Sequence, residues 1–264
     1  MKIGVIGLGN MAKAILSGML AKGIVTKEDV IGSAATQATI DKVREQYGIA
    51  VTLDNREVAK GADVLLLAVK PQFMADVISQ IRDDVTEDTL VITIAAGKTI
   101  NWYEEAFGKK IRLVRCMPNT PAMVGEGCTA VCRNDRVTQE DMDYAMTLMN
   151  SFGRASEIRE GLMDAFSAVS GSSPAYVFMF IEAMADAAVA GGMPRAQAYK
   201  FASQAVLGSA KMVLETGKHP GELKDMVCSP AGTTIQAVRV LEEKGMRSSV
   251  FEAMMKCLDI SRSM

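Results

Sequence analysis

The sequence predicts an α/β protein with an N-terminal Rossmann-type dinucleotide-binding domain followed by an all-helical dimerisation domain. Short β-branched runs alternate with amphipathic stretches in the first half, which is typical of a parallel sheet flanked by helices. A glycine-rich turn follows the first of these runs. After about residue 158 the β-branched runs stop, and Ala, Met and Leu recur at helical spacing. We therefore expect a cofactor domain over residues 1–158 and a helical domain over residues 159–264.

The elements of the first half follow from this alternation. The predicted strands are Lys2–Ile6, Val30–Ser33, Val64–Val69, Leu90–Ile94, Ile111–Met117 and Cys128–Cys132. The predicted helices are Met11–Lys22, Thr39–Tyr47, Arg56–Lys60, Phe73–Arg82 and Gln139–Ser151. The run from Val64 to Val69 is apolar without alternation, as expected of a strand that is covered on both faces.

The second half contains one helix that is apolar nearly all round. It spans Ala175–Ala190 and carries only Glu182 and Asp186 as charges, four residues apart on one face. Such a helix is short, and its two acids are costly, for a membrane span. We expect no membrane contact and instead a second subunit that covers this helix.

Composition excludes several classes of protein. A net charge of −2 leaves no electrostatic footprint for nucleic acid. The five cysteines form no Cys-x-x-Cys pair, so neither a disulfide framework nor a metal site is predicted. The N-terminus does not resemble a signal peptide, and we expect a cytoplasmic protein. The single histidine, His219, excludes mechanisms that need a histidine pair.

A dinucleotide motif follows the first strand. Residues 7–12 read Gly-x-Gly-x-x-Ala between a predicted strand and a predicted helix. Gly7 permits the tight turn, Gly9 lets the backbone approach a pyrophosphate, and the small Ala12 lets the helix pack closely. The expected cofactor contacts in this segment are Gly7, Leu8, Gly9, Asn10, Met11 and Ala12.

The end of the second strand bears on the choice of cofactor. An NAD site usually places an acidic residue there to bind the ribose 2′-hydroxyl, and this chain has none between Val30 and Ile40. The hydroxyls of Ser33 and Thr36 can accept a 2′-phosphate without repelling it. NADPH is therefore favoured, and a neutral turn that accepts NADH as well is the alternative.

Three later segments are unusually specific for helix connections. A rigid turn with two prolines spans 118–121, and hydroxyl-rich segments open predicted helices at 170–176 and 229–235. We expect Ser173 to cap its helix and Pro174 to occupy the first helical position. Two helix N-termini rich in hydroxyls and free N–H groups can form a binding site for a small carboxylate, and we expect Ser173 among the substrate contacts. The alternative is that both are simply well-capped helices.

These segments together resemble one known family. The motifs are Gly-x-Gly-x-x-Ala at 7–12, Ala-Val-Lys-Pro at 68–71, Met-Pro-Asn-Thr-Pro at 117–121, Ser-Gly-Ser-Ser-Pro-Ala-Tyr at 170–176 and Asp-Met-Val-Cys-Ser-Pro-Ala-Gly-Thr-Thr-Ile at 225–235. In this order and spacing they resemble pyrroline-5-carboxylate reductases. The resemblance implies reduction of 1-pyrroline-5-carboxylate to L-proline by hydride transfer from NADPH or NADH, the last step of proline biosynthesis. It also implies a dimer with interleaved helical domains, and in many members a decamer.

The resemblance also implies roles for individual residues. Thr234 would be catalytic and hydrogen-bond the ring nitrogen, while backbone N–H groups of Gly232, Thr233 and Thr234 would hold the substrate carboxylate. A protonated cyclic imine is already an electrophile, so this reaction needs positioning more than a dedicated acid. Some relatives have a glutamate where this chain has Gly217. The implied cofactor contacts outside the glycine turn are Asn55, Ala68, Val69, Lys70 and Pro71.

Two other functions are open to the same architecture. A β-hydroxyacid dehydrogenase-like NADP oxidoreductase needs a lysine base on the helix that follows a Ser-Gly-type turn. No lysine occurs from Gly161 to Tyr199, which disfavours this alternative. A non-catalytic nucleotide-binding scaffold is disfavoured by the intact segment 229–235. His219 lies in a helix connection, where capping the preceding helix is favoured over contact with substrate.

Overall fold

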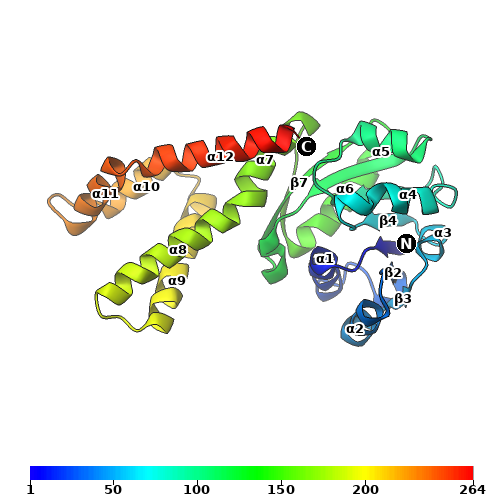
Figure 1. Ribbon diagram of the computed structural model, residues 1–264, viewed down its shortest axis with the longest axis horizontal. Helices are drawn as coiled ribbons and strands as arrows, with labels where there is room; N and C mark the ends of the chain where they lie inside the picture. Colours follow the sequence, from blue (N-terminus) through cyan, green and yellow to red (C-terminus); the bar gives the residue numbers. More distant parts are fainter. Residues whose placement is uncertain (264) are drawn as a thin grey trace. The chain divides into compact units, whose positions relative to one another are not determined.

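The computed structural model describes residues 1–263 and divides into two compact units (Figure 1). The first unit comprises residues 1–171 together with the described end of the chain from Ser261. The second comprises Ser172–Ile260. We describe each unit by itself.

A single sheet forms the centre of the first unit. Within the described residues it has eight strands in the order β3-β2-β1-β4-β5-β6-β7-β8. The strands are β1 (Ile3–Ile6), β2 (Val30–Ser33), β3 (Ala50–Thr52), β4 (Val64–Leu67), β5 (Leu90–Thr93), β6 (Arg112–Met117), β7 (Gly127–Arg133) and β8 (Gly153–Glu157). The first six are parallel, whereas β7 is antiparallel to β6 and β8 is parallel to β7.

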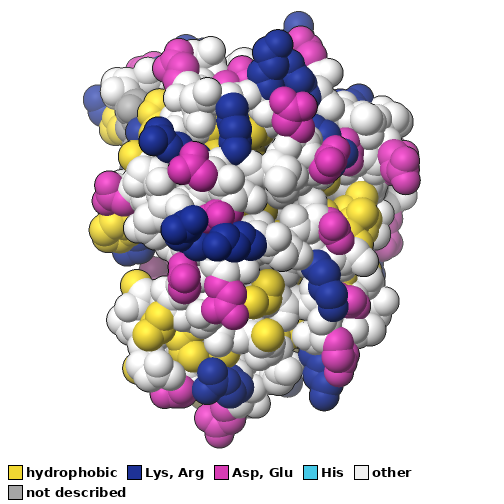
Figure 2. Space-filling model, turned by 90° about the vertical axis from the view of Figure 1, so that its right-hand side faces the viewer, with side chains coloured by type: hydrophobic (Ala, Val, Ile, Leu, Met, Phe, Trp, Pro, Cys, Tyr) yellow, Lys and Arg dark blue, Asp and Glu magenta, His cyan; other side chains and the backbone are white. Residues whose placement is uncertain are grey.

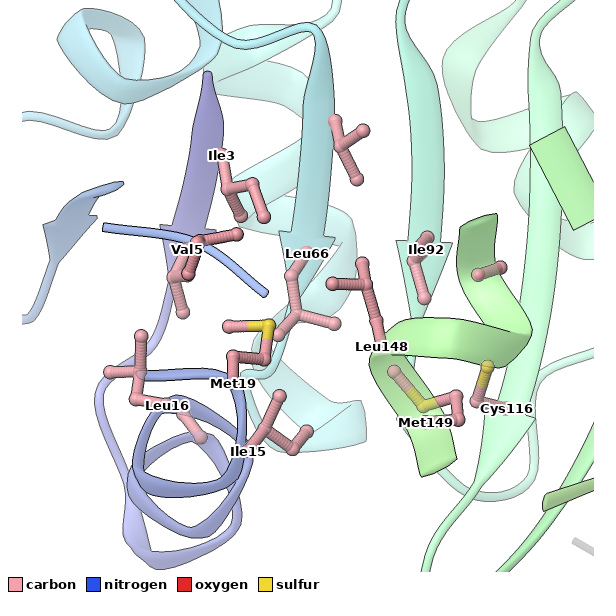
Figure 3. Close-up of a cluster of buried hydrophobic side chains, with 14 of the residues drawn as sticks. Ile3, Val5, Ile15, Leu16, Met19, Leu66, Ile92, Cys116, Leu148 and Met149 are labelled. Carbon is pink, nitrogen blue, oxygen red and sulfur yellow. The ribbon is translucent and has the colours of Figure 1, made fainter. Parts of the chain in front are cut away.

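Helices cover both faces of this sheet and bury a core on each. The helices of the first unit are α1 (Asn10–Ala21), α2 (Gln37–Tyr47), α3 (Asn55–Lys60), α4 (Met74–Ile81), α5 (Ile100–Phe107), α6 (Gln139–Met149) and α7 (Met163–Phe166). On one face, side chains of α1 and α6 such as Ile15 and Leu148 pack against Val5, Leu66 and Ile92 of the strands (Figure 3). On the other face, α3, α4 and α5 pack against the alternate residues of the same strands.

The predicted Rossmann sheet is confirmed for its parallel part, and the structure differs at the edges. The turn between β6 and β7 is too short for a crossover helix, so β7 must run antiparallel to its neighbour. Strands β3 and β8 and helix α5 were not predicted. β3 has three residues and none of them is fully buried, while β8 is mostly polar, so neither gives a hydrophobic pattern.

The first unit extends past the predicted boundary at residue 158. Met163 is buried against Ala130 and Cys132 of β7, and Phe166 packs on the same cluster. The Ser261 hydroxyl near the end of the chain also donates to Asp164 Oδ1 at 2.7 Å. The segment that follows β8 therefore belongs to the sheet domain by packing.

The second unit is entirely helical within the described residues. Its helices are α8 (Ser173–Ala190), α9 (Arg195–Thr216), α10 (Pro220–Val227), α11 (Thr233–Glu243) and α12 (Met246–Arg262), the last two residues of α12 belonging to the first unit. Helices α8 and α9 lie side by side as a hairpin (Figure 1). Among the described residues of this unit only Ala185, Ala198 and Ala202 are fully buried. Large apolar side chains such as Phe178 and Met179 are 58% and 68% exposed.

One helical run in the described chain, Glu160–Ala190, is long and apolar enough by length and composition to cross a membrane. Only 6% of its most apolar window is buried within the chain. The exposed apolar surface of the whole second unit has the character of an interface.

The helix that contains Ser173 begins earlier than predicted. A π-helical segment, η6 (Ser167–Ser172), connects α7 directly to α8, and Ser172 has helical backbone angles. The prediction that Ser173 caps a helix N-terminus with free N–H groups is therefore wrong. The π-helical segment accommodates Pro174, whose ring cannot take part in regular α-helical hydrogen bonding.

Candidate active site

The predicted cofactor segments meet at the carboxyl edge of the sheet. The Gly7 N–H donates to the Ser33 carbonyl at 2.9 Å, and the Ala68 N–H donates to the Ile6 carbonyl at 2.8 Å. The ends of β1, β2 and β4 are thus direct neighbours. The chain runs from β1 through β2 to β3 on one side of β1 and then crosses to β4 on the other side. This reversal makes the edge a topological switch point, where α/β folds bind ligands.

The two glycines of the turn are needed for different reasons. Gly7 has φ of +94°, and a Cβ there would lie 2.8 Å from Val69 Cγ1 and 2.9 Å from the Ala68 carbonyl carbon. A Cβ at Gly9 would meet no atom within 4 Å. Gly7 is therefore required by the fold, whereas Gly9 leaves open space above the backbone for a ligand.

Helix α1 presents its free N-terminus to that space. No side chain caps it and its first turn contains no acidic residue. Its first N–H groups lack intrahelical partners and lie at the positive end of the helix dipole, which suits a pyrophosphate. Ala12 is 1% exposed and lets α1 pack closely on the sheet. The residues present therefore fit a dinucleotide cofactor.

A hydrogen-bonded chain of three side chains flanks the end of β2. Ser33 is fully buried, and its hydroxyl donates to Asn55 Oδ1 at 2.7 Å. Asn55 Nδ2 in turn donates to Gln80 Oε1 at 2.8 Å. The Ser33 hydroxyl is thus engaged inside the protein, and the half-buried Asn55 amide is the more accessible group. Gln80 lies within α4 and belongs to no motif, so the sequence contained no signal for it.

Thr36 and Lys70 are exposed near the same edge. The Thr36 hydroxyl accepts the Thr39 N–H at 3.4 Å and caps α2. Lys70 precedes a short 3₁₀ helix that opens with Pro71. Thr36 follows the end of β2 and Lys70 follows the end of β4, and their contacts with a cofactor stay a prediction.

A second N-terminus, that of α11, carries the predicted substrate residues. Gly232 is its N-cap, and the Gly232 N–H donates to the Ser229 carbonyl at 3.0 Å. A Cβ at Gly232 would overlap the Ser229 hydroxyl oxygen. Ala231, with φ of +57°, is the one non-glycine residue with positive φ among residues 1–263. Strained backbone of this kind costs about 1–3 kcal/mol and concentrates at functional sites.

The start of α11 offers hydrogen-bond donors and a hydroxyl. No side chain caps this helix, so the first N–H groups after Gly232 have no partner from the helix itself. Thr234 is half-buried in the first turn. A small carboxylate bound at the N–H groups would lie beside the Thr234 hydroxyl, which can donate or accept. Ser173 lies on α8 of the same unit.

His219 caps a helix. Its Nδ1 accepts the Gly221 N–H at 3.0 Å at the start of α10. The contact is structural, but the prediction that His219 caps the preceding helix is wrong, because the histidine caps the helix that follows it.

The described residues contain no cluster of His, Cys, Asp or Glu that could hold a metal ion. Burial raises the pKa of the Cys132 thiol to about 12 and that of Cys116 further still. These two thiols are therefore unreactive core residues. On the face shown in Figure 2, basic and acidic side chains intermingle.

Comparison with known proteins agrees with this geometry. Residues 160–264 match the family model described as pyrroline-5-carboxylate reductase dimerisation, and residues 2–97 match that of NADP oxidoreductase, coenzyme F420-dependent. The chain is 54% identical to the pyrroline-5-carboxylate reductase of Escherichia coli strain K12, over 100% of this chain and 98% of that protein.

Solved structures show the same relationship. A pyrroline-5-carboxylate reductase from Coxiella burnetii superposes with a TM-score of 0.92 at 35% identity, covering 99% of this chain and 97% of the other. The pyrroline carboxylate reductase of Plasmodium falciparum, solved with NADP bound, has a TM-score of 0.89 at 32% identity, covering 100% and 97%. The open glycine turn and the helical second unit agree with this similarity, which extends over the full length of the chain. The chain belongs to the pyrroline-5-carboxylate reductase family.

Proposed function

We propose that this chain reduces 1-pyrroline-5-carboxylate to L-proline with NADPH as hydride donor, in the last step of proline biosynthesis. The observation that carries the proposal is the free N-terminus of α11, which follows the strained Ala231 and presents Thr234. An anionic ring with a basic nitrogen matches these donors and this hydroxyl.

The proposed roles on the substrate side follow from chemistry. The N–H groups of Gly232, Thr233 and Thr234 hold the carboxylate, and the Thr234 hydroxyl hydrogen-bonds the ring nitrogen. Ser173 is a further substrate contact. Bound NADPH supplies the hydride that adds to C5. Because the protonated imine is already electrophilic, Thr234 orients the ring and stabilises the charge on nitrogen without transferring a proton.

On the cofactor side, residues 7–12 bind the pyrophosphate, and Ala68, Val69, Lys70 and Pro71 line the neighbouring strand end. Thr36 and Asn55 contact the 2′-phosphate of NADPH, and Ser33 acts by holding Asn55. The absence of an acidic residue between Val30 and Ile40 supports the preference for NADPH over NADH.

The active form is a dimer built from the second unit. The exposed apolar side chains of α8 to α12 and the dimerisation family model support this. Assembly of dimers into a decamer is a further prediction. All five cysteines are free thiols, which supports a reducing, cytoplasmic environment.

The test is turnover by the purified chain. With 1-pyrroline-5-carboxylate and NADPH, the reduced-nicotinamide absorbance should fall while L-proline accumulates in equal amount. NADH should give lower catalytic efficiency. If the absorbance does not fall with either NADPH or NADH, the proposal is overturned.

A further inference from the structure

Asn119, in the loop after β6, is a buried side chain for which the proposed chemistry has no role. It is 8% exposed. Its Oδ1 accepts the Cys128 N–H at 2.8 Å, and its Nδ2 donates to the Ser170 carbonyl and hydroxyl oxygens, both at 3.1 Å. Because a backbone N–H only donates and a carbonyl only accepts, the amide has a single orientation.

The Ser170 carbonyl, which accepts from Asn119, cannot form a regular α-helical hydrogen bond. Ser170 lies in the π-helical segment η6, four residues before Pro174. In a regular α-helix the Ser170 carbonyl would accept the N–H of residue 174, and proline has none. The carbonyl therefore lacks its α-helical partner, and the Asn119 amide donates to it instead.

This contact sits where the chain passes from one unit to the other. The first unit includes Gly171, and the second begins at Ser172. The loop that carries Asn119 follows the carboxyl end of β6, which belongs to the same edge of the parallel sheet as the glycine turn. Met117, the last residue of β6, places its Cε 3.5 Å from the Cβ position of Gly171. Asn119 thus fixes the last residues of the first unit, directly before the helical unit in the sequence, to the loop after β6.

We propose that Asn119 is a positioning residue for hydride transfer, because it locks the π-helical segment from which α8 and its Ser173 continue. The inference rests on the proposed function. Hydride transfer requires donor and acceptor carbons at a fixed close distance, so a loosened π-helical segment should lower kcat while the contacts of the cofactor stay intact.

The chain offers a matched control in Asn134. It is also 8% exposed, accepts the Leu113 N–H at 3.2 Å and donates to the Ile111 carbonyl at 2.9 Å and to Glu104 at 2.7 Å. It lies at the opposite end of β6. Asn119→Ala and Asn134→Ala therefore remove the same kind of buried amide at two different places.

We expect Asn119→Ala to lower kcat by about 10- to 100-fold, since misplacement by about 1 Å costs on that order. The Kd for NADPH, measured by fluorescence, should stay within about twofold, as expected for a change that leaves the cofactor contacts intact. Asn134→Ala should lose similar thermal stability and keep its kcat. An unchanged kcat in Asn119→Ala, or an equal loss in both variants, would overturn the proposal.

Two further variants test the proposal if Asn119→Ala folds poorly. Asn119→Asp keeps the acceptor for the Cys128 N–H and removes the donors to Ser170, so it should show the same loss of kcat. Ser170→Ala removes one of the two bonds and should show a smaller loss. If kcat is unchanged in both Asn119→Asp and Ser170→Ala, the proposal is contradicted.

Hydrogen exchange supplies a readout that does not depend on turnover. The amides of Ser167–Ser172 should exchange faster in Asn119→Asp and at the normal rate in Asn134→Ala; unchanged exchange in Asn119→Asp would refute the lock. If the unmodified chain fails to reduce 1-pyrroline-5-carboxylate, the proposed function and the kinetic role fall, while the exchange result still decides whether Asn119 locks the segment.

Discussion

At the scale of single residues, two glycines of one motif differ in what they do. The Cβ position of Gly7 overlaps Val69, and its φ is positive, whereas that of Gly9 faces open space. We expect Gly7→Ala to destabilise the fold by roughly 1–2 kcal/mol or more, because it adds a left-handed residue and a steric overlap. Gly9→Ala should leave the melting temperature unchanged and weaken NADPH binding about tenfold or more, since the methyl group fills the cofactor approach.

Thermal melts and fluorescence titration of both variants check this pair. If Gly9→Ala were destabilised while its cofactor affinity stayed normal, the open space at Gly9 would have no role in cofactor binding.

Thr234 is the second residue whose role can be isolated. Thr234→Ala removes a hydrogen bond to a charged nitrogen, worth about 1.5–3 kcal/mol, so kcat should fall by about 10- to 150-fold. Thr234→Ser retains the hydroxyl and should recover most of the rate. NADPH affinity should be normal in both. Full activity of the alanine variant in steady-state assays would remove Thr234 from the mechanism.

At the scale of elements, the N-terminus of α2 lends itself to a test of cofactor choice. Thr36 caps this helix, and Asp and Asn are equally good caps. Thr36→Asp places a negative charge beside the expected 2′-phosphate, which should weaken NADPH binding about tenfold and change NADH binding little. Thr36→Asn keeps the cap without the charge and serves as the control. Equal losses for both cofactors would show that the 2′-phosphate does not lie near Thr36.

Most elements could be predicted because each has its own local pattern. The strands β1, β4 and β5 are apolar runs followed by turns, and the glycine motif marks the start of α1. The helix start at Ser173 was predicted wrongly, because hydroxyls followed by proline are also compatible with a π-helical segment held from outside. That support comes from Asn119, which is 51 residues away from Ser170. The same limit applies to Gln80, whose contact with Asn55 depends on how α3 and α4 pack.

At the scale of the whole molecule, the second unit lacks a core of its own. Phe178 and Met179 are more than half exposed on α8. Covering each such side chain contributes about 1.5–3 kcal/mol, so Met179→Glu should raise the dimer dissociation constant by at least about tenfold. Gln46→Glu, on the exposed surface of α2, adds the same charge and should not. Light scattering over a concentration series measures both, and a monomeric unmodified chain at micromolar concentration would contradict the dimer.

The central claim is the proposed transfer of a hydride from NADPH to C5 of a cyclic imine. The most direct measurement supplies NADPH that carries deuterium at the reactive face of the nicotinamide, and analyses the product by mass spectrometry and NMR. We predict L-proline with one deuterium at C5. Proline without deuterium, or no proline at all, would contradict the account.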